Sequence, residues 1–197
     1  MRLGIFGGTF DPVHNAHLTV AREAADQFHL SQVWFVPAAR PPHKTDHELV
    51  SFEDRCRMVE LACKDDPRFL LSLLEAGKGK SYSVETLETV RGMGEDPYFI
   101  IGADAFAEIT SWHRWQDLMK LTEFIVVTRP GHDYLAPPGA KVNRLDTVAL
   151  PVSSSDIRRR LGAGESPAEL PSPVLQYIIG HGLYEFHKKL APPVSYP

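Results

Sequence analysis

Two histidines and a pair of glycines near the start of the chain are the residues best suited to chemistry. Gly7 and Gly8 follow the apolar run Leu3–Phe6, and His14 and His17 stand three residues apart shortly afterwards. If a helix begins beside the first histidine, both imidazoles lie on one face of its first turn. Unpaired backbone N–H groups there favour an anion, and glycines let it approach closely. The spacing therefore predicts a polyphosphate site.

A second segment, far along the chain, has similar features. Ser154 and Ser155 follow an apolar run, and Arg158 comes one turn into the helix that they open. Hydroxyl groups can cap that helix, and a guanidinium fork matches phosphate oxygens. Arg159 and Arg160 point elsewhere, because neighbours on a helix diverge by about 100°. We therefore expect Arg158 to be the phosphate ligand of this segment.

The two best-known phosphate loops are absent from the sequence. The pattern Gly-x-x-x-x-Gly-Lys-Ser/Thr does not occur, and the spacing of Gly4, Gly7 and Gly8 does not fit Gly-x-Gly-x-x-Gly. A P-loop NTPase and an ordinary dehydrogenase are thus disfavoured.

Strands and helices that alternate along the chain must position these groups. The apolar, β-branched runs predict strands at 3–6, 33–36, 69–74, 98–101, 124–128 and 147–150. Helices are expected at 14–28, 51–65, 83–92, 103–109, 114–121, 154–161 and 172–180, and a Gly- and Pro-rich surface loop at 131–144. This rhythm predicts an α/β fold: a single-domain, Rossmann-like, doubly wound, mainly parallel sheet with helices on both faces. Ligands bind such sheets where the strand order reverses.

Composition sets further bounds. At 197 residues, 43% hydrophobic and 23% charged, the chain suits one domain, expected over 1–190 with a loose tail at 191–197. The net charge of −4 argues against a nucleic-acid partner. No apolar run approaches the ~18 residues that span a bilayer, so we expect no membrane partner and a cytoplasmic location. Cys56 and Cys63 lie about two helical turns apart, which is too far for a disulfide. We expect both to be thiols in the core and not ligands of a zinc ion. The composition leaves open whether the protein forms a homo-oligomer.

The chain resembles a known superfamily. The nucleotidyltransferases of the HxGH superfamily are similar to it in two motifs, Gly7-Gly8-Thr9-Phe10-Asp11-Pro12-x-His14-x-x-His17 and Val152-Ser153-Ser154-Ser155-x-Ile157-Arg158. Within that superfamily, the bacterial nicotinate-nucleotide adenylyltransferases resemble it in four further segments, Pro41-Pro42-His43-Lys44, Ser81-Tyr82-Ser83, Gly102-Ala103-Asp104 and Trp112. The resemblance runs from residue 1 to about residue 187.

This resemblance implies transfer of AMP from ATP to the 5′-phosphate of nicotinic acid mononucleotide, giving deamido-NAD and pyrophosphate. The acceptor phosphate is already an anion, so no covalent enzyme intermediate is required. An in-line displacement needs alignment and charge neutralisation. Mg²⁺ is expected to arrive on the ATP phosphates with mostly water ligands, without a metal site built of protein alone.

The resemblance also implies a role for each residue. The catalytic set is His14, His17, Lys44 and Arg158. The ATP-binding set is Gly7, Gly8, Thr9, Phe10, His14, His17, Gly102, Asp104, Ser154, Ser155 and Arg158. Asp104 would accept a hydrogen bond from a ribose hydroxyl, and an equally good interpretation is that it caps its helix. The acceptor-binding set is Lys44, Ser83 and Trp112. Trp112 would stack on the pyridine ring, and Ser83 with the amides of its helix would receive the nicotinate carboxylate.

Three positions depart from the family pattern. Ala16 stands where the family usually has glycine, and Val152 and Ser155 replace the commoner isoleucine and threonine. The methyl group of Ala16 would crowd the nucleotide slightly, whereas the other two changes are conservative.

Three other functions compete with this interpretation. They are a different HxGH enzyme, such as a pantetheine-phosphate adenylyltransferase or a cytidylyltransferase, a module that binds ATP without catalysis, and a truncated aminoacyl-tRNA synthetase core. The Pro-Pro-His-Lys and tryptophan segments favour the pyridine nucleotide over the first. The complete set of donors argues against the second, and the acidic charge balance against the third.

Overall fold

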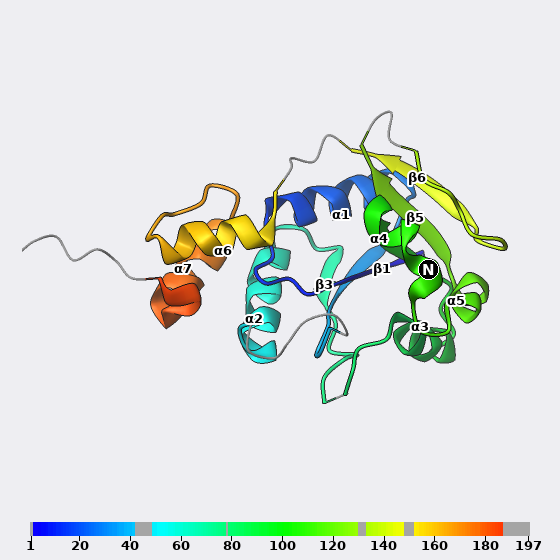
Figure 1. Ribbon diagram of the computed structural model, residues 1–197, viewed down its shortest axis with the longest axis horizontal. Coiled ribbons are helices and arrows are strands. Elements are labelled where there is room, and N and C mark those ends of the chain that lie inside the picture. Colours follow the sequence, from blue (N-terminus) through cyan, green and yellow to red (C-terminus); the bar gives the residue numbers. More distant parts are fainter. Residues whose placement is uncertain (1, 42–48, 78, 130–132, 148–151, 187–197) are drawn as a thin grey trace, which may run out of the picture.

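A parallel β-sheet forms the centre of the molecule (Figure 1). The computed structural model describes residues 2–41, 49–77, 79–129, 133–147 and 152–186. Within these ranges six strands pair in the order β3-β2-β1-β4-β5-β6, and every neighbouring pair is parallel. The strands are β1 (Leu3–Gly8), β2 (Gln32–Pro37), β3 (Phe69–Leu71), β4 (Pro97–Gly102), β5 (Glu123–Thr128) and β6 (Val142–Asp146). The strand order reverses between β1 and β4, as the sequence predicted for the ligand site.

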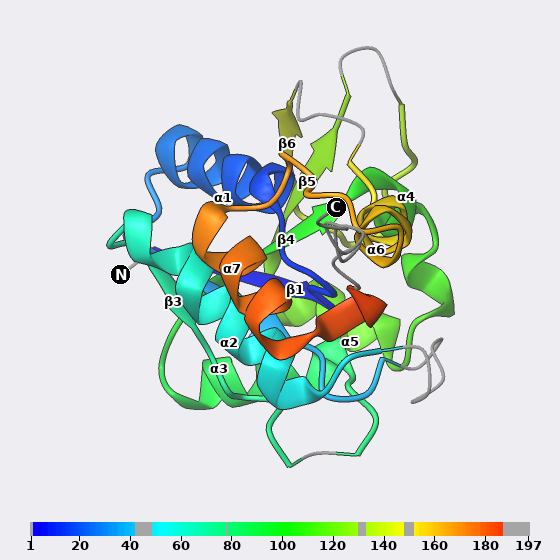
Figure 2. The same ribbon diagram turned by 90° about the vertical axis from the view of Figure 1, so that its left-hand side faces the viewer.

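Helices cover both faces of the sheet. One face packs against α1 (Asn15–Gln27), α2 (Phe52–Ala62), α6 (Ser154–Gly162) and α7 (Ser172–His181), and the other against α3 (Ser83–Gly92), α4 (Ala103–Ala107) and α5 (Trp115–Leu121). Short 3₁₀ turns are η2 (Cys63–Asp65), η3 (Ile109–Ser111) and η4 (Leu183–Glu185). In Figure 2, α7 lies in front beside α2, and the hydroxyl of Tyr177 on α7 donates to Asp54 of α2 at 2.8 Å. The predicted doubly wound fold is confirmed.

The alternation of side chains along the strands explains the two cores. Successive residues of a strand point to opposite faces. Ile100 of β4 packs with Val33 and Phe35 on the α1 side, whereas its neighbours Phe99 and Ile101 pack on the α3 side. Both faces are therefore apolar, and the strands are continuous hydrophobic runs.

The last strand differs from its prediction. β6 occupies Val142–Asp146, which overlaps the end of the loop expected at 131–144, and pairs with β5 from Phe124↔Val142 to Thr128↔Asp146. The predicted strand at 147–150 is wrong at Thr147, and residues 148–150 lie outside the described residues. β6 is at the sheet edge with only Leu145 fully buried, and an edge strand tolerates polar residues such as Asn143 and Arg144.

Several other boundaries shift. β3 ends at Leu71, three residues before its prediction. β1 includes Gly7 and Gly8, which pair with β2, so the glycines end the strand and the turn follows them. α3 starts at Ser83, with Tyr82 as its N-cap. The tail predicted at 191–197 lies outside the described residues.

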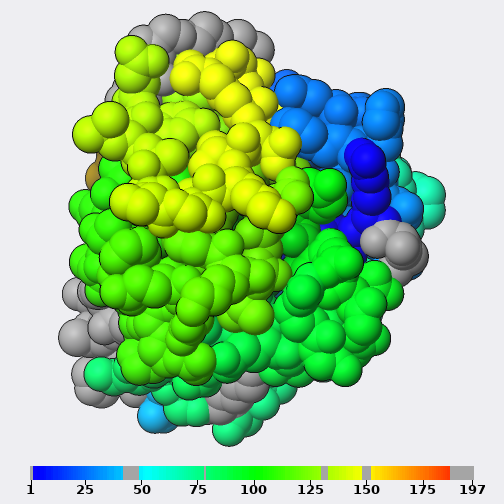
Figure 3. Space-filling model, turned by 90° about the vertical axis from the view of Figure 1, so that its right-hand side faces the viewer, coloured from blue at the N-terminus to red at the C-terminus, as the bar shows by residue number. Residues whose placement is uncertain are grey.

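The end of the molecule that carries the N-terminus lies opposite the carboxyl ends of the strands. Figure 3 shows this end, with the first residues in dark blue between the blue chain near α1 and the green segments. Among the described helices none is long and apolar enough to cross a membrane.

Candidate active site

The two imidazoles lie together at the start of α1. His14 is the N-cap of the helix, and its backbone N–H donates to Nδ1 of His17 at 3.2 Å. Their rings stack with centroids 3.7 Å apart and planes inclined by 24°. Because a backbone N–H can only donate, Nδ1 of His17 is the acceptor, and in the neutral ring the proton is on Nε2. The predicted pair therefore forms, with one donor direction fixed by the backbone.

Burial keeps these rings neutral. His14 is 4% exposed, and burial lowers its pKa to about 4 despite the opposing charge of Glu169. Burial also lowers the pKa of His17 well below its usual range, and His14 adds to this effect. Two stacked imidazolium rings would repel each other. At neutral pH the site thus presents uncharged N–H donors to a phosphate.

The start of α6 lies against the turn after β1. Ser154 Oγ donates to the backbone oxygen of Pro12 at 3.2 Å. Arg158 Nη1 donates to the backbone oxygen of Asp11 at 2.7 Å, and Nη2 donates to Ser155 Oγ at 3.2 Å. Segments more than 140 residues apart therefore meet at one turn.

A cavity of about 550 Å³ opens between α1 and the carboxyl ends of β4 and β5. Both histidines line it, together with Ala16, Gly102, Asp104, Thr128, Arg129, Thr147, Val152 and Ser154. We call this space the histidine cavity. Asp104 is the second residue of α4, and its side chain is exposed and does not cap the helix. Arg129 contributes a cation to this cavity.

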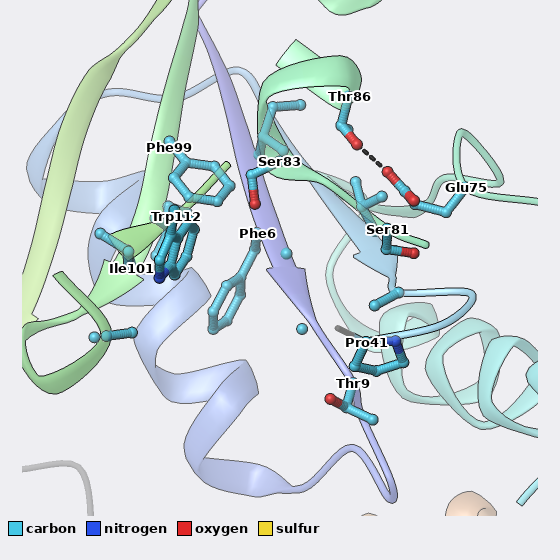
Figure 4. A pocket seen from close by; sticks show the side chains of 18 residues that line it. Phe6, Thr9, Pro41, Glu75, Ser81, Ser83, Thr86, Phe99, Ile101 and Trp112 are labelled. Atoms are coloured by element: carbon cyan, nitrogen blue, oxygen red, sulfur yellow. Dashed lines mark hydrogen bonds between the residues drawn. The ribbon is translucent and has the colours of Figure 1, made fainter. Parts of the chain in front are cut away.

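A second cavity of about 370 Å³ lies on the other side of β4 (Figure 4). We call it the tryptophan cavity. Trp112 and Phe6 lie on one side of it, and Ser81 and Pro41 on the other. Ser83, the first residue of α3, also lines it. The ring of Trp112 meets that of Phe99 edge to face, with centroids 6.5 Å apart.

The two cavities meet at the sheet. Gly102, which ends β4, lines both. Gly7, Gly8 and Thr9 line the tryptophan cavity and not the histidine cavity. A ligand in either cavity thus comes close to the backbone where the strand order reverses.

One buried carboxylate in the tryptophan cavity was not expected. Glu75 is 3% exposed, and its Oε1 accepts a hydrogen bond from the hydroxyl of Thr86 on α3 (Figure 4). Its Oε2 has no hydrogen-bond partner among the described residues. The first turn of α3 lies nearby, and a helix N-terminus stabilises negative charge.

A buried arginine, which the sequence analysis did not identify, joins the loops of the site by hydrogen bonds. Arg55 of α2 is 1% exposed, and its guanidinium donates to the backbone oxygens of Thr9, Ala38 and Ala39 at 2.8, 2.7 and 3.2 Å. Burial lowers its pKa, and the charge of Asp11 opposes that shift. An arginine within the apolar stripe of residues 55, 58, 59 and 62 was the available signal.

Two predicted site residues need separate comment. The side chain of Phe10 is buried in the core, with its ring 5.1 Å from that of His17, so only its backbone is available to a ligand. A Cβ on Gly8 would come within 2.9 Å of the Phe10 ring, so this close approach requires glycine. Lys44, expected in both the catalytic and the acceptor-binding set, lies outside the described residues.

Comparison with known proteins agrees with this geometry. A family model described as cytidylyltransferase-like matches residues 5–160. The chain is 53% identical over 187 residues to a probable nicotinate-nucleotide adenylyltransferase of Solibacter usitatus, covering 93% of this chain and 100% of that protein. It is 43% identical to a similarly named protein of Saccharopolyspora erythraea, covering 93% and 89%. In fold it is similar to Plasmodium falciparum nicotinic acid mononucleotide adenylyltransferase complexed with NaAD, with TM-score 0.78, 22% identity and coverage of 94% and 98%.

Proposed function

Because the chain belongs to the nicotinate-nucleotide adenylyltransferases, within the cytidylyltransferase-like family, we propose that it transfers AMP from ATP to the 5′-phosphate of nicotinic acid mononucleotide. The products are deamido-NAD and pyrophosphate, and the reaction serves NAD biosynthesis. The observation that carries this proposal is the pair of cavities that meet at Gly102. Two substrates bound there would direct their phosphates toward the same strand ends.

The histidine cavity suits ATP. Neutral imidazole donors at the start of α1 can bind the phosphates without an ion pair that product release would have to break. Ser154 lines the same cavity, and Arg158 is attached to the adjoining turn. Donors aimed at the charge that develops on pyrophosphate lower the barrier by about 3–4 kcal/mol each. Asp104 lines the same cavity and would accept a hydrogen bond from a ribose hydroxyl of the nucleotide.

The tryptophan cavity suits the acceptor mononucleotide. Trp112 offers a flat face to the pyridine ring. The N–H groups of Ser83 and Val84 open α3, where a nicotinate carboxylate is stabilised more than a neutral amide. The acceptor phosphate attacks the α-phosphorus of ATP in line, and pyrophosphate leaves. No base is needed, because the nucleophile already carries its negative charge.

Mg²⁺ fits this site as a companion of ATP. Asp104 is the one carboxylate among the described residues that line the histidine cavity, and nowhere in the described part of the chain are three or more acidic, histidine or cysteine side chains placed to hold a metal ion together. Mg²⁺ is commonly held by one or two carboxylates, substrate phosphates and water, which matches this donor set. When bound, the ion neutralises charge on the triphosphate.

The test is release of pyrophosphate from ATP and Mg²⁺ with a panel of phosphate acceptors. We expect turnover with nicotinic acid mononucleotide. The kcat/KM for nicotinamide mononucleotide should be lower by about 10-fold or more, because the helix terminus favours the carboxylate. Equal values for the two would contradict the role of α3. Turnover only with 4′-phosphopantetheine, or ATP binding without pyrophosphate release for any acceptor, would contradict the proposed reaction.

A further inference from the structure

The carboxylate of Asp11 lies between a tyrosine and the predicted phosphate ligand. Asp11 is 1% exposed, and its Oδ1 accepts a hydrogen bond of 2.7 Å from the hydroxyl of Tyr184. Its Oδ2 has no hydrogen-bond partner among the described residues and lies 3.7 Å from Nη1 of Arg158. A buried carboxylate with an unsatisfied oxygen attracts any nearby cation strongly.

Arg158 is held by protein acceptors in this structure. Nη1 donates to the backbone oxygen of Asp11 and Nη2 to Ser155, and the side chain is 25% exposed. Arg158 is also absent from the residues that line the histidine cavity. A triphosphate in that cavity must therefore compete with residue 11 for this guanidinium.

Tyr184 reaches Asp11 from the C-terminal part of the fold. It lies in η4, where Tyr184 and Glu185 both have left-handed backbone conformations, with φ of 59° and 54°. Such a conformation is unfavourable for residues other than glycine and persists only where the surroundings hold it. The ring packs against the core. Burial, then the charge of Asp11, raises the pKa of the hydroxyl well above its usual range, so it remains a donor.

Building on the proposed adenylyl transfer, we propose that Asp11 is a positioning residue that retains Arg158 until a triphosphate displaces it, and that Tyr184 sets the strength of this retention. The hydroxyl satisfies one carboxylate oxygen and holds the group in place. Without it, the carboxylate would turn toward Arg158 and close the 3.7 Å separation to a direct ion pair. The η4 turn thus adjusts affinity for ATP without contacting the nucleotide.

The decisive variant is Tyr184→Phe, which retains the ring and removes the hydroxyl. We expect the Kd for ATP, measured by calorimetry without acceptor, to rise about 10-fold, the scale of one hydrogen bond to a charged group. KM for ATP should rise equally, while kcat at saturating ATP changes less than about twofold, because Arg158 still reaches the phosphates once ATP is bound. Asp11→Asn should lower the Kd for ATP, because the competing charge is gone.

Tyr177→Phe is the matched control. Its hydroxyl also donates to an aspartate, Asp54, at 2.8 Å, but across the α2–α7 contact. This variant should leave the Kd for ATP unchanged. In an Arg158→Ala background, the Tyr184→Phe change should no longer affect ATP binding.

The role of Asp11 and Tyr184 is overturned by any of three results. These are a melting temperature lowered by Tyr184→Phe with unchanged ATP affinity, an effect of that variant that persists without Arg158, and an Asp11→Asn protein that binds ATP more weakly. Because ATP binding is measured without an acceptor, failure of this coupling is distinguishable from failure of adenylyl transfer, which the pyrophosphate assay reports separately.

Discussion

The histidine cavity and the tryptophan cavity are assembled in different ways. The predicted phosphate ligands of the first come from two short segments, the turn into α1 and the turn into α6, which hydrogen bonds join directly. The walls of the second come from β1, the chain after β2, the start of α3 and the segment around Trp112. The first presents polar donors, whereas the second combines aromatic faces with one buried carboxylate. The groups proposed for catalysis thus come from two short motifs, whereas the walls of the proposed acceptor site come from several elements of the fold.

Removing one imidazole is the strongest test of this division. We expect His17→Ala to lower kcat about 100- to 1,000-fold, because an aimed N–H donor is lost, while KM for nicotinic acid mononucleotide stays within about threefold. Steady-state kinetics and circular dichroism measure both effects. His181→Ala, an exposed histidine on α7, is the control. Near-normal turnover in the His17 variant would refute the catalytic assignment.

The buried histidines should also make stability depend on pH. The pKa of His14 is about 4 in the folded protein and about 6.5 in the unfolded chain. Between these values the unfolded chain takes up a proton that folded His14 does not, so the free energy of unfolding falls as pH drops from about 6.5 to about 4. The loss is about 3 kcal/mol.

Urea unfolding at pH 7, 6, 5 and 4.5 measures this loss. A His14→Gln protein should show a smaller loss over the same range, whereas His181→Gln should behave like the parent protein. Identical pH profiles for the parent and the His14 variant would contradict the neutral, buried state of the ring.

Truncating the aromatic wall tests the other cavity. Trp112→Ala should raise KM for nicotinic acid mononucleotide about 10-fold through lost ring stacking, with KM for ATP unchanged. Trp112→Phe should recover part of the loss, because it retains a flat ring. A change confined to KM for ATP would show that the two cavities do not divide the substrates in this way.

The smallest effect is expected at Ala16, which lines the histidine cavity. Ala16→Gly removes a methyl group from the lining of this cavity and should change KM for ATP by no more than about fourfold, because a single methyl group contributes about 0.8 kcal/mol. Glycine also lowers helix stability, by about 1 kcal/mol, so thermal melting must accompany the kinetics. A loss of turnover on the scale of the His17 variant would mean that this methyl group positions the phosphates.

Local patterns predicted most of the fold. Helix α3 falls on its expected residues 83–92, and α6 and α7 differ by one residue at their ends. Periodic apolar residues and terminal signals were sufficient there. β6 was misplaced, because an edge strand buries one side chain and carries no continuous apolar run.

Within the site, too, residues in a local sequence pattern were predicted and residues outside one were not. The meeting of His14, His17 and Ser154 was predictable, because each opens a helix at a strand end. Arg55, Glu75 and Tyr184 were missed, because none of them belongs to a local motif, and Tyr184 bonds to Asp11, 173 residues away. A charged residue at a core position indicates burial but does not identify its partner.

Gly102 sets a limit on how this site can vary. Its backbone is extended with φ of −69°, and a Cβ placed there would meet no protein atom within 4 Å. The fold itself therefore makes no demand for glycine at the end of β4. An alanine at this position would leave folding intact yet project toward the two cavities that Gly102 lines, so a need for glycine here would come from bound substrates and not from the fold.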